Sequence, residues 1–284
     1  MRFQKNIFQV WFQGCDKVDK PIYIQNMQNW KNMNPDWQYR CMSDNDLRKE
    51  CAKFSKECLA TYDSFNIMHL KIDFGRYVTL YNNGGMYADV DTHVIRPLDM
   101  SKDIQKILDV CEKQNKHVIG LSEMHAVNVI DIFILKQITM FNNGIIVATP
   151  HNPFLKEFIE YIIRISKEKP YYQDQYLKVH HLTGPISLNK YLALYDKFTN
   201  TNVMYKFKST VFDTCISNLC KITEDTICLH IYASSWAPQY MQKVSKFGTY
   251  LLDRIVTISL ILIILIAIII YTWIRRNCGC NNNK

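Results

Sequence analysis

Two aspartates, Asp89 and Asp91, lie one residue apart in the stretch NNGGMYADVDT, residues 82–92. In an extended segment alternate side chains share a face, so we expect both carboxylates to point the same way. Two carboxylates this close repel, and one is normally protonated unless a cation lies between them. The pair therefore predicts a site for a divalent metal ion, because hard cations prefer oxygen ligands.

A second pair of chemically capable residues, Asp73 and Arg76, lies on a helix predicted over residues 65–81. Side chains three residues apart on a helix are neighbours on one face, and Asn83-Gly84 is typical of a left-handed helix cap. Asp73 and Arg76 form either a surface ion pair, which would contribute little stability, or a pair that points into a cleft beside the two aspartates. The spacing is compatible with both arrangements.

The elements before this segment alternate between strands and helices. Strands are predicted over residues 7–14 and 37–42, with a helix over residues 21–31 between them and helix N-caps at residues 43–46. This order favours an α/β sheet with parallel members.

Elements of the same two kinds follow the aspartate pair. A strand is predicted over residues 142–148 and an amphipathic helix over residues 154–165. A turn at residues 183–185 precedes another helix, and residues 227–230 form the last predicted strand. We find no internal repeat and no domain linker before about residue 242.

Composition excludes some classes of protein. The chain has 284 residues, of which 48% are hydrophobic and 21% charged, so wholesale disorder is not expected. The formal net charge of +8 would suit nucleic acid or acidic lipid, but the lysines are spread along the chain. We therefore expect a basic solvated surface and no nucleic-acid partner.

The ten cysteines follow no C-x-x-C pattern, and the chain contains no N-x-[ST] sequon. These features predict reduced, mostly buried thiols in a chain that never enters a secretory lumen. The group Cys215, Cys220, Cys228 and His230 has a spacing that fits none of the usual zinc templates.

The C-terminal part of the chain predicts a membrane anchor. The run from Val256 to Ile274 is uncharged and would be about 28 Å long as a helix, close to the thickness of a bilayer core. We therefore expect a catalytic domain over residues 1–245 and an anchor over residues 246–284, with a single transmembrane helix at about 256–274. The apolar stretch at residues 7–12 is too short for a signal peptide, which predicts a cytosolic catalytic domain.

These motifs together resemble glycosyltransferase family 32, the group with a DXD-containing sugar-binding region. The densest match is D-x-x-R-Y-x-x-L-Y-x-x-G-G-x-Y-x-D-x-D, from Asp73 to Asp91. Further matches are Trp11, N-P-D-W at 34–37, N-G-I-I-V-A-x-P-x-x-P-F at 143–154, T-G-P at 183–185 and H-x-x-x-S-S-W at 230–236. The resemblance covers nearly all of residues 5–240, and the same core is similar to the glucosyltransferase domain of the large clostridial toxins. It implies a GT-A-type, Rossmann-like mixed sheet flanked by helices.

The resemblance also implies a metal site and its ligands. Asp91 is expected to bind Mn²⁺ or Mg²⁺ directly, and Asp89 to contact the ribose, the donor sugar or a metal-bound water. His230 and Ser234 would complete the metal and diphosphate site. Gly75 departs from the bulkier apolar residue usual in the family, which puts the rigidity of Arg76 in question.

The donor would be a nucleotide-sugar, UDP- or GDP-linked, and several residues are expected to contact it. Arg76 and Trp236 would face diphosphate oxygens, Asp73 a sugar hydroxyl, and Trp11 the nucleotide base. Tyr87 also belongs to the implied donor site. Asn142, Asn143 and Asp174 are expected to line the acceptor side.

The implied reaction is transfer of a hexose from the nucleotide-sugar to a hydroxyl of a glycan, lipid or protein, with retention of anomeric configuration. We identify no carboxylate as a covalent nucleophile, which favours a front-face mechanism. The predicted anchor favours a lipid or membrane-bound glycan as the acceptor.

Two other functions fit parts of the sequence. Asp89-Val90-Asp91-Thr92 also satisfies the first motif of haloacid-dehalogenase-type phosphatases, in which Asp89 would be the nucleophile. That class needs a long apolar strand before this motif and an acidic loop after it, and neither is present in the sequence. The other alternative is a membrane-anchored binding protein with a degenerate transferase fold, which gives no reason to keep two repelling carboxylates together.

Overall fold

The computed structural model describes residues 2–123, 141–168, 174–212, 214–215, 222–231, 259 and 261–273. The chain divides into two compact units, one of residues 1–127 and 131–233 and the other of residues 128–130 and 234–284. The first unit carries the predicted motifs. Of the second unit, only residues 259 and 261–273 are described.

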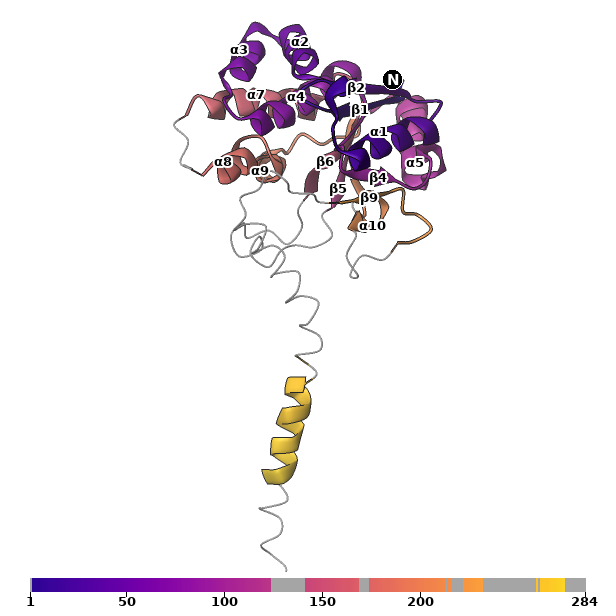
Figure 1. Ribbon diagram of the computed structural model, residues 1–284, viewed down its shortest axis with the longest axis vertical. Helices are drawn as coiled ribbons and strands as arrows, with labels where there is room; N and C mark the ends of the chain where they lie inside the picture. The colour runs from indigo at the N-terminus through magenta and orange to yellow at the C-terminus, as the bar shows by residue number, and fades with distance from the viewer. Residues whose placement is uncertain are drawn as a thin grey trace, which may run out of the picture. The chain divides into compact units, whose positions relative to one another are not determined.

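A six-stranded mixed sheet runs through the first unit, in the order β2-β1-β3-β6-β5-β7 (Figure 1). Its strands are β1 (Asn6–Val10), β2 (Gln38–Met42), β3 (Gly85–Ala88), β5 (His117–Glu123), β6 (Phe141–Ala148) and β7 (Asn202–Phe207). β1 is parallel to β2 and β3, β7 is parallel to β5, and β6 is antiparallel to β3 and β5. The start of β6 therefore meets the carboxyl ends of β3 and β5 at one edge of the sheet. The expected α/β sheet with parallel members is confirmed.

A second, three-stranded sheet has the order β4-β9-β8. It consists of β4 (Thr92–Val94), β8 (Thr214–Cys215) and β9 (Cys228–His230). The antiparallel pairing of β4 with β9 places Thr92 opposite His230. Because Thr92 directly follows Asp91, this register brings His230 to the predicted metal site.

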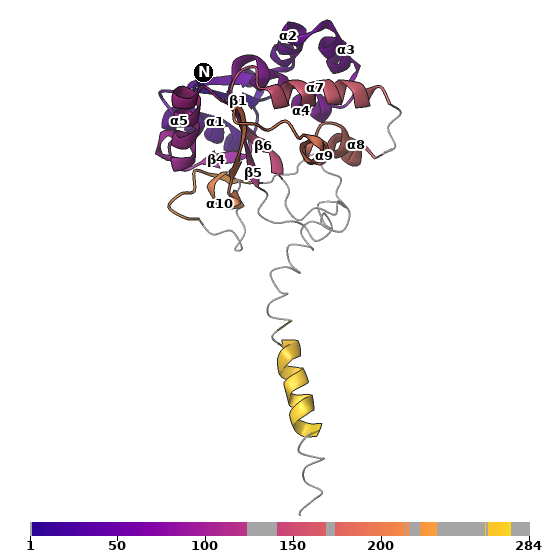
Figure 2. The ribbon, with the colours of Figure 1, turned by 180° about the vertical axis from the view of Figure 1, so that it is seen from behind.

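Helices cover both faces of the large sheet (Figures 1 and 2). One face is covered by α2 (Asp44–Phe54), α3 (Lys56–Ser64), α4 (Met68–Asn83), α7 (Pro153–Ser166), α8 (Gln175–Leu182) and α9 (Pro185–Leu194). The other is covered by α1 (Pro21–Met33), α5 (Lys102–Gln114) and α10 (Ser209–Phe212). Single-turn helices η1 (Cys15–Lys17) and η2 (Leu98–Met100) complete the elements of the first unit. A hydrophobic core lies on each face of the sheet. Successive residues of β1 point to opposite faces, since Phe8 packs in the core under α4 and Ile7 in the core under α5.

The segment with the aspartate pair differs from the expectation. α4 ends at Asn83 and Gly84 donates its N–H to the carbonyl of Leu80, so the helix stops where the cap prediction placed its end, but with φ 64° and ψ 172° Gly84 does not have the expected left-handed helical conformation. β3 then ends at Ala88, however, and Asp89 lies outside the strand. The carbonyl of Asp89 accepts the N–H of Thr92, so residues 89–92 form a turn. Strand alternation is therefore the wrong reason for bringing Asp89 and Asp91 together.

The first strand is also shorter than expected. It ends at Val10, and Trp11 to Gly14 lie beyond it. Cys15, which follows, forms a disulfide with Cys41 of the neighbouring strand β2. This pair corrects the expectation of reduced thiols for Cys15 and Cys41, whereas Cys51, Cys58, Cys111 and Cys228 are buried thiols as expected. Disulfides are rare in the cytosol, so the pair also argues against a cytosolic domain.

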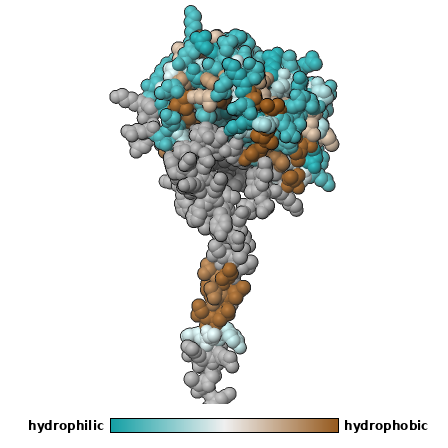
Figure 3. Space-filling model, viewed as in Figure 1, coloured by the Kyte–Doolittle hydropathy of each residue, from teal (hydrophilic) through white to brown (hydrophobic). Residues whose placement is uncertain are grey.

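The predicted membrane anchor is only partly described. Residues 261–273 form a helix with exposed apolar side chains, which Figure 3 shows as a hydrophobic segment. Among the described residues, no helix combines the length and apolarity needed to cross a bilayer. Residues 256–258, 260 and 274 of the expected span lie outside the described residues, as do residues 232–258 around the expected domain boundary. The anchor and the boundary stay predictions.

Gly85 allows β3 to approach β1 closely, and this predicts a measurable difference between two glycine substitutions. Gly85 and Gly14 have nearly the same positive φ, 114° and 113°, which costs any other residue about 1–3 kcal/mol. A Cβ at Gly85 would lie 2.6 Å from the backbone oxygen of Asn6, whereas one at Gly14 would meet only the Asp16 side chain. We expect Gly85→Ala to lower the free energy of unfolding by roughly 1–3 kcal/mol more than Gly14→Ala.

Urea denaturation of the full-length protein, followed by tryptophan fluorescence with the disulfide intact, measures this difference. Gly14→Ala is the matched control, since it introduces the backbone strain without the clash. Equal losses in the two variants would contradict the close approach of β3 to β1.

Candidate functional site

Three residues expected at the metal site lie together. Asp89, Asp91 and His230 each offer a ligand atom, and these atoms all lie within 4.8 Å of one another. His230 Nε2 is 3.3 Å from Asp91 Oδ1. The turn after β3 supplies the two aspartates, and the last residue of β9 supplies the histidine. Ser234, the fourth expected ligand, lies outside the described residues.

The donor set fits a divalent cation. Carboxylate oxygens and an imidazole nitrogen suit Mn²⁺, and the carboxylates alone suit Mg²⁺. The side chains of Asp89 and Asp91 are 27% and 17% exposed, so a cation can reach them. Burial raises the pKa of Asp89, the positive charge of Arg76 lowers it, and the Asp91 carboxylate raises it again, with a net increase. A bound cation would offset this cost of holding two carboxylates together.

Gly144 leaves the space that the cluster occupies. A Cβ at this position would lie 2.7 Å from Asp89 Oδ2 and 3.0 Å from His230 Cε1. The Gly144 backbone also connects to both sides of the site, because its carbonyl accepts the N–H of Asp89 and its N–H donates to Asn142 Oδ1, both at 2.8 Å. Glycine is therefore required here by the close approach of the metal-binding side chains.

Arg76 joins the cluster to the buried part of the site. Its guanidinium is 2.7 Å from Asp73 Oδ1 and 3.3 Å from Asp89 Oδ1, and Nη1 donates to the carbonyl of Asn143 at 2.7 Å. Burial lowers the pKa of Arg76, and neighbouring groups, Asp89 first and Asp73 among them, raise it, with a net increase, so the group stays charged. The pair of Asp73 and Arg76 is thus a buried ion pair beside the metal-binding residues, and the surface alternative is excluded.

Asp73 is enclosed by hydrogen-bond donors and is only 7% exposed. Asn143 Nδ2 donates to its Oδ1 at 3.2 Å, and the Thr183 hydroxyl donates to its Oδ2 at 3.3 Å. Burial raises the pKa of Asp73 to about 6, against the lowering effects of Arg76 and of these two donors. The carboxylate is therefore mostly ionised at neutral pH.

Tyr87 and Trp11, both expected to contact the donor, occupy different environments. Tyr87 is 2% exposed, and the Arg76 guanidinium lies over its ring. Its hydroxyl donates to Asp89 Oδ1 at 2.6 Å, so Tyr87 holds the Asp89 carboxylate from the buried side of the site. Trp11 is half-buried beyond β1, with its ring 5.7 Å from that of Tyr23. Trp236 lies outside the described residues.

Several residues at the site were assigned differently or missed. Asn142 and Asn143 contact His230 and Asp73, and their expected place on the acceptor side stays a prediction. Asp174, expected there too, caps α8 by accepting the N–H of Leu177. Gln9 was missed, although a lone amide in an apolar strand was a signal: its Nε2 donates to the carbonyl of Asp89 at 3.1 Å.

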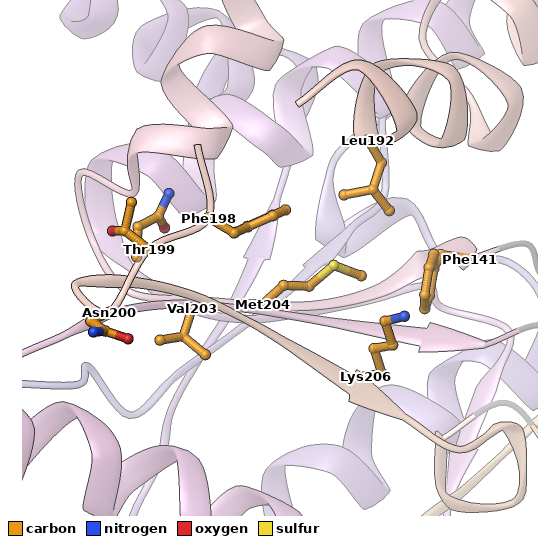
Figure 4. A pocket seen from close by; sticks show the side chains of 9 residues that line it. Phe141, Leu192, Phe198, Thr199, Asn200, Val203, Met204 and Lys206 are labelled. Atoms are coloured by element: carbon orange, nitrogen blue, oxygen red, sulfur yellow. The ribbon is translucent and has the colours of Figure 1, made fainter. Parts of the chain in front are cut away.

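A groove of about 630 Å³ lies along β7, on the face of the sheet covered by α9 (Figure 4). It is lined by Phe141, Leu192, Phe198, Thr199, Asn200, Asn202, Val203, Met204 and Lys206. Figure 4 shows Phe141 at one end and Asn200 at the other. At the first end, Lys206 Nζ lies 5.7 Å from the centre of the Phe141 ring. Phe141 directly precedes Asn142, so this end of the groove lies at the start of β6, the strand that also carries Asn142 and Gly144.

Comparison with known proteins identifies one region of the chain. Residues 22–115 match the family described as "Glycosyltransferase sugar-binding region containing DXD motif". An initiation-specific alpha-1,6-mannosyltransferase of Candida albicans is 31% identical over 125 residues, which cover 42% of this chain and 32% of the relative. An uncharacterized glycosyltransferase of Acanthamoeba polyphaga mimivirus is 27% identical over 245 residues, 82% of this chain and 83% of the relative. The chain thus covers about a third of the length of its Candida relative.

Two solved structures are also similar. The PaToxG glycosyltransferase has 16% sequence identity and a TM-score of 0.45, over 68% of this chain and 69% of that one. The catalytic domain of alpha-toxin from Clostridium novyi has 12% identity and a TM-score of 0.40, over 87% of this chain and 83% of that one.

The space at Gly144 leads to a prediction about metal binding. In Gly144→Ala the added methyl group would displace Asp89 and His230, so we expect affinity for Mn²⁺ to fall about 10- to 100-fold while the protein stays folded. Titration of the full-length protein with Mn²⁺, followed by electron paramagnetic resonance of the free ion, measures the affinity.

Gly75→Ala is the matched control, because it adds the same methyl group inside the protein against Leu47. We expect this variant to lose stability and to keep its affinity for Mn²⁺. Unchanged affinity in Gly144→Ala would show that the cluster does not bind the metal.

Proposed function

Residues 22–115 match the family described as a glycosyltransferase sugar-binding region containing a DXD motif, and from this similarity we propose that the protein is a metal-dependent glycosyltransferase. It transfers a hexose from a UDP- or GDP-linked sugar to the hydroxyl of an acceptor. The observation that carries the proposal is the convergence of Asp89, Asp91 and His230 within 4.8 Å beside the buried Asp73–Arg76 pair. Because the Candida relative is named a mannosyltransferase, GDP-mannose is the first donor to test.

The described residues support distinct roles in this reaction. Asp89, Asp91 and His230 would hold Mn²⁺ or Mg²⁺, which when bound supplies positive charge for the leaving diphosphate. Arg76 fixes Asp89 through an ion pair and adds a second positive charge at the site. Asp73 would accept a hydroxyl of the donor sugar, and Trp11 would stack on the base. In the proposal Ser234 and Trp236 complete the diphosphate site.

The reaction is proposed to retain the anomeric configuration without a covalent intermediate, and the contacts of the carboxylates at the site bear on this proposal. A carboxylate nucleophile needs a free oxygen that faces the anomeric carbon. Asp89 accepts the Tyr87 hydroxyl and pairs with Arg76, and Asp73 is surrounded by Arg76, Asn143 and Thr183. The contacts on both oxygens of Asp73 favour a front-face mechanism within a GT-A-type domain, whereas the two contacts of Asp89 are both made by Oδ1.

Donor hydrolysis and transfer provide the test of this function. We expect the full-length protein to release nucleoside diphosphate from one of GDP-mannose, UDP-glucose, UDP-galactose and UDP-N-acetylglucosamine with Mn²⁺, and not with EDTA. Asp91→Asn removes a charged ligand and should lower the rate about 100-fold or more.

Asp63→Asn is the matched control, because Asp63 pairs with Arg48 on the surface and should be dispensable. Release that persists in EDTA or in Asp91→Asn would rule out the metal-dependent reaction. Mn²⁺-dependent nucleotide binding without any release would instead support the degenerate binding protein.

The groove along β7 is the proposed acceptor site. One end begins at Phe141, next to Asn142, so an acceptor lying in the groove would have one end beside the strand that carries Asn142 and Gly144. The apolar side chains of Leu192, Phe198 and Met204 suit a hydrocarbon chain. A lipid-linked glycan, the acceptor class that the predicted membrane anchor favours, therefore fits this groove.

Filling the groove should affect the acceptor and not the donor. Met204→Trp places a larger side chain in the groove, so we expect the KM for a lipid-linked acceptor to rise about tenfold or more while donor hydrolysis is unchanged. Tyr205→Trp is the control, because Tyr205 packs on the opposite face of the same strand. An equal effect of both variants on the acceptor KM would argue against the groove.

A further inference from the structure

The two ring nitrogens of His230 face groups of opposite character. Nε2 lies 3.3 Å from the Asp91 Oδ1, which accepts hydrogen bonds. Nδ1 lies 3.3 Å from the Asn142 Nδ2, an amide NH₂ group that only donates. The position of the imidazole proton therefore depends on whether the Asn142 amide has this orientation.

The backbone fixes that orientation. The N–H of Gly144 donates to Asn142 Oδ1 at 2.8 Å, and a backbone N–H cannot accept a hydrogen bond. Oδ1 must therefore face Gly144, and Nδ2 must face His230. Since Nδ2 donates, Nδ1 of His230 must accept, and the neutral ring then carries its single proton on Nε2.

This tautomer conflicts with metal binding through Nε2. A nitrogen that carries a proton donates to Asp91 and has no lone pair for a cation. If the proton moved to Nδ1 instead, two donors would face each other across the contact with Asn142. Rotating the Asn142 amide by half a turn would relieve that contact, but its NH₂ group would then face the N–H of Gly144.

We propose that Asn142 holds His230 with its proton on Nε2 in the metal-free protein, so that a divalent cation gains this nitrogen only when the Asn142 amide turns over and releases Gly144. The inference rests on the metal site of the proposed function. In the metal-free protein His230 is a positioning residue that donates to Asp91. On loading, the proton of the neutral ring moves from Nε2 to Nδ1 by exchange with water, and the number of protons on the ring is unchanged.

The chain contains a histidine–asparagine pair with the opposite orientation. Asn26 Nδ2 donates to the carbonyl of Val90 at 3.1 Å, which leaves Oδ1 to face Nδ1 of His93 at 3.0 Å. An amide oxygen only accepts, so the proton of neutral His93 lies on Nδ1. His93 and His230 belong to adjacent strands and are expected to be opposite tautomers.

Nuclear magnetic resonance of the full-length protein with ¹⁵N-labelled histidine distinguishes these tautomers directly. After removal of metal with EDTA, we expect the two-bond ¹H–¹⁵N pattern of Nε2–H for His230 and of Nδ1–H for His93. His230→Gln and His93→Gln assign the two signals by their loss. An Nδ1–H pattern for His230 in the metal-free protein would overturn the inference.

Asn142→Asp tests the coupling to the metal. A carboxylate can accept from Gly144 N–H and from Nδ1–H of His230 together, so Nδ1 should carry a proton without metal, and affinity for Mn²⁺ should rise about tenfold. Asn143→Asp adds the same charge one residue away, at a side chain that contacts Asp73 and Tyr77. We expect it to leave the His230 proton on Nε2 and to raise the affinity less.

An equal rise in Mn²⁺ affinity in both variants, or an unchanged tautomer in Asn142→Asp, would overturn the coupling. Neither readout involves sugar transfer. If the tautomers and the Mn²⁺ affinities are as expected but the protein transfers no sugar, this inference is supported and only the proposed function is contradicted.

Discussion

The charge of Arg76 is the interaction on which the rest of the site depends. Its guanidinium is buried between Asp73 and Asp89, and Asp91 lies just beyond. Without it, the buried carboxylates would lose their partner, and breaking such a pair costs about 3–5 kcal/mol. With it, three carboxylates still face a single guanidinium among the described residues, which leaves two negative charges at the site. A divalent cation is the group that balances them.

The backbone brings these charges together by close approach. Gly85 lets β3 lie against β1, and Gly144 leaves room for Asp89 and His230 where β6 begins. Between them, the β4–β9 pairing places His230 opposite Thr92. Each contact joins segments far apart in the sequence, so the site forms only when both sheets are complete. This explains why glycine is needed at points where the neighbouring group is backbone or a metal-binding side chain.

Local patterns in the sequence predicted part of this arrangement. Helical spacing placed Asp73 and Arg76 on one face of α4, and the glycine after Asn83 ended that helix as expected. The prediction for Asp89 and Asp91 reached the right cluster through the wrong geometry, because a turn follows β3 where an extended strand was assumed. The roles of Asn142 and Gly144 depend on an irregular register between β5 and β6, and the Cys15–Cys41 disulfide on strand pairing. Periodicity carries no information about either.

The third donor of the cluster is a histidine, and the charge balance gives a reason for it. A third carboxylate would add a negative charge that one divalent cation leaves uncompensated, whereas a neutral imidazole adds a lone pair and no charge. The imidazole has a proton to place, however, and its position is decided by Asn142 and, through it, by the N–H of Gly144. The same glycine that makes room for the ligands thus also determines which nitrogen of His230 is available. Metal binding is in this way tied to the backbone at the start of β6, where the proposed acceptor groove also begins.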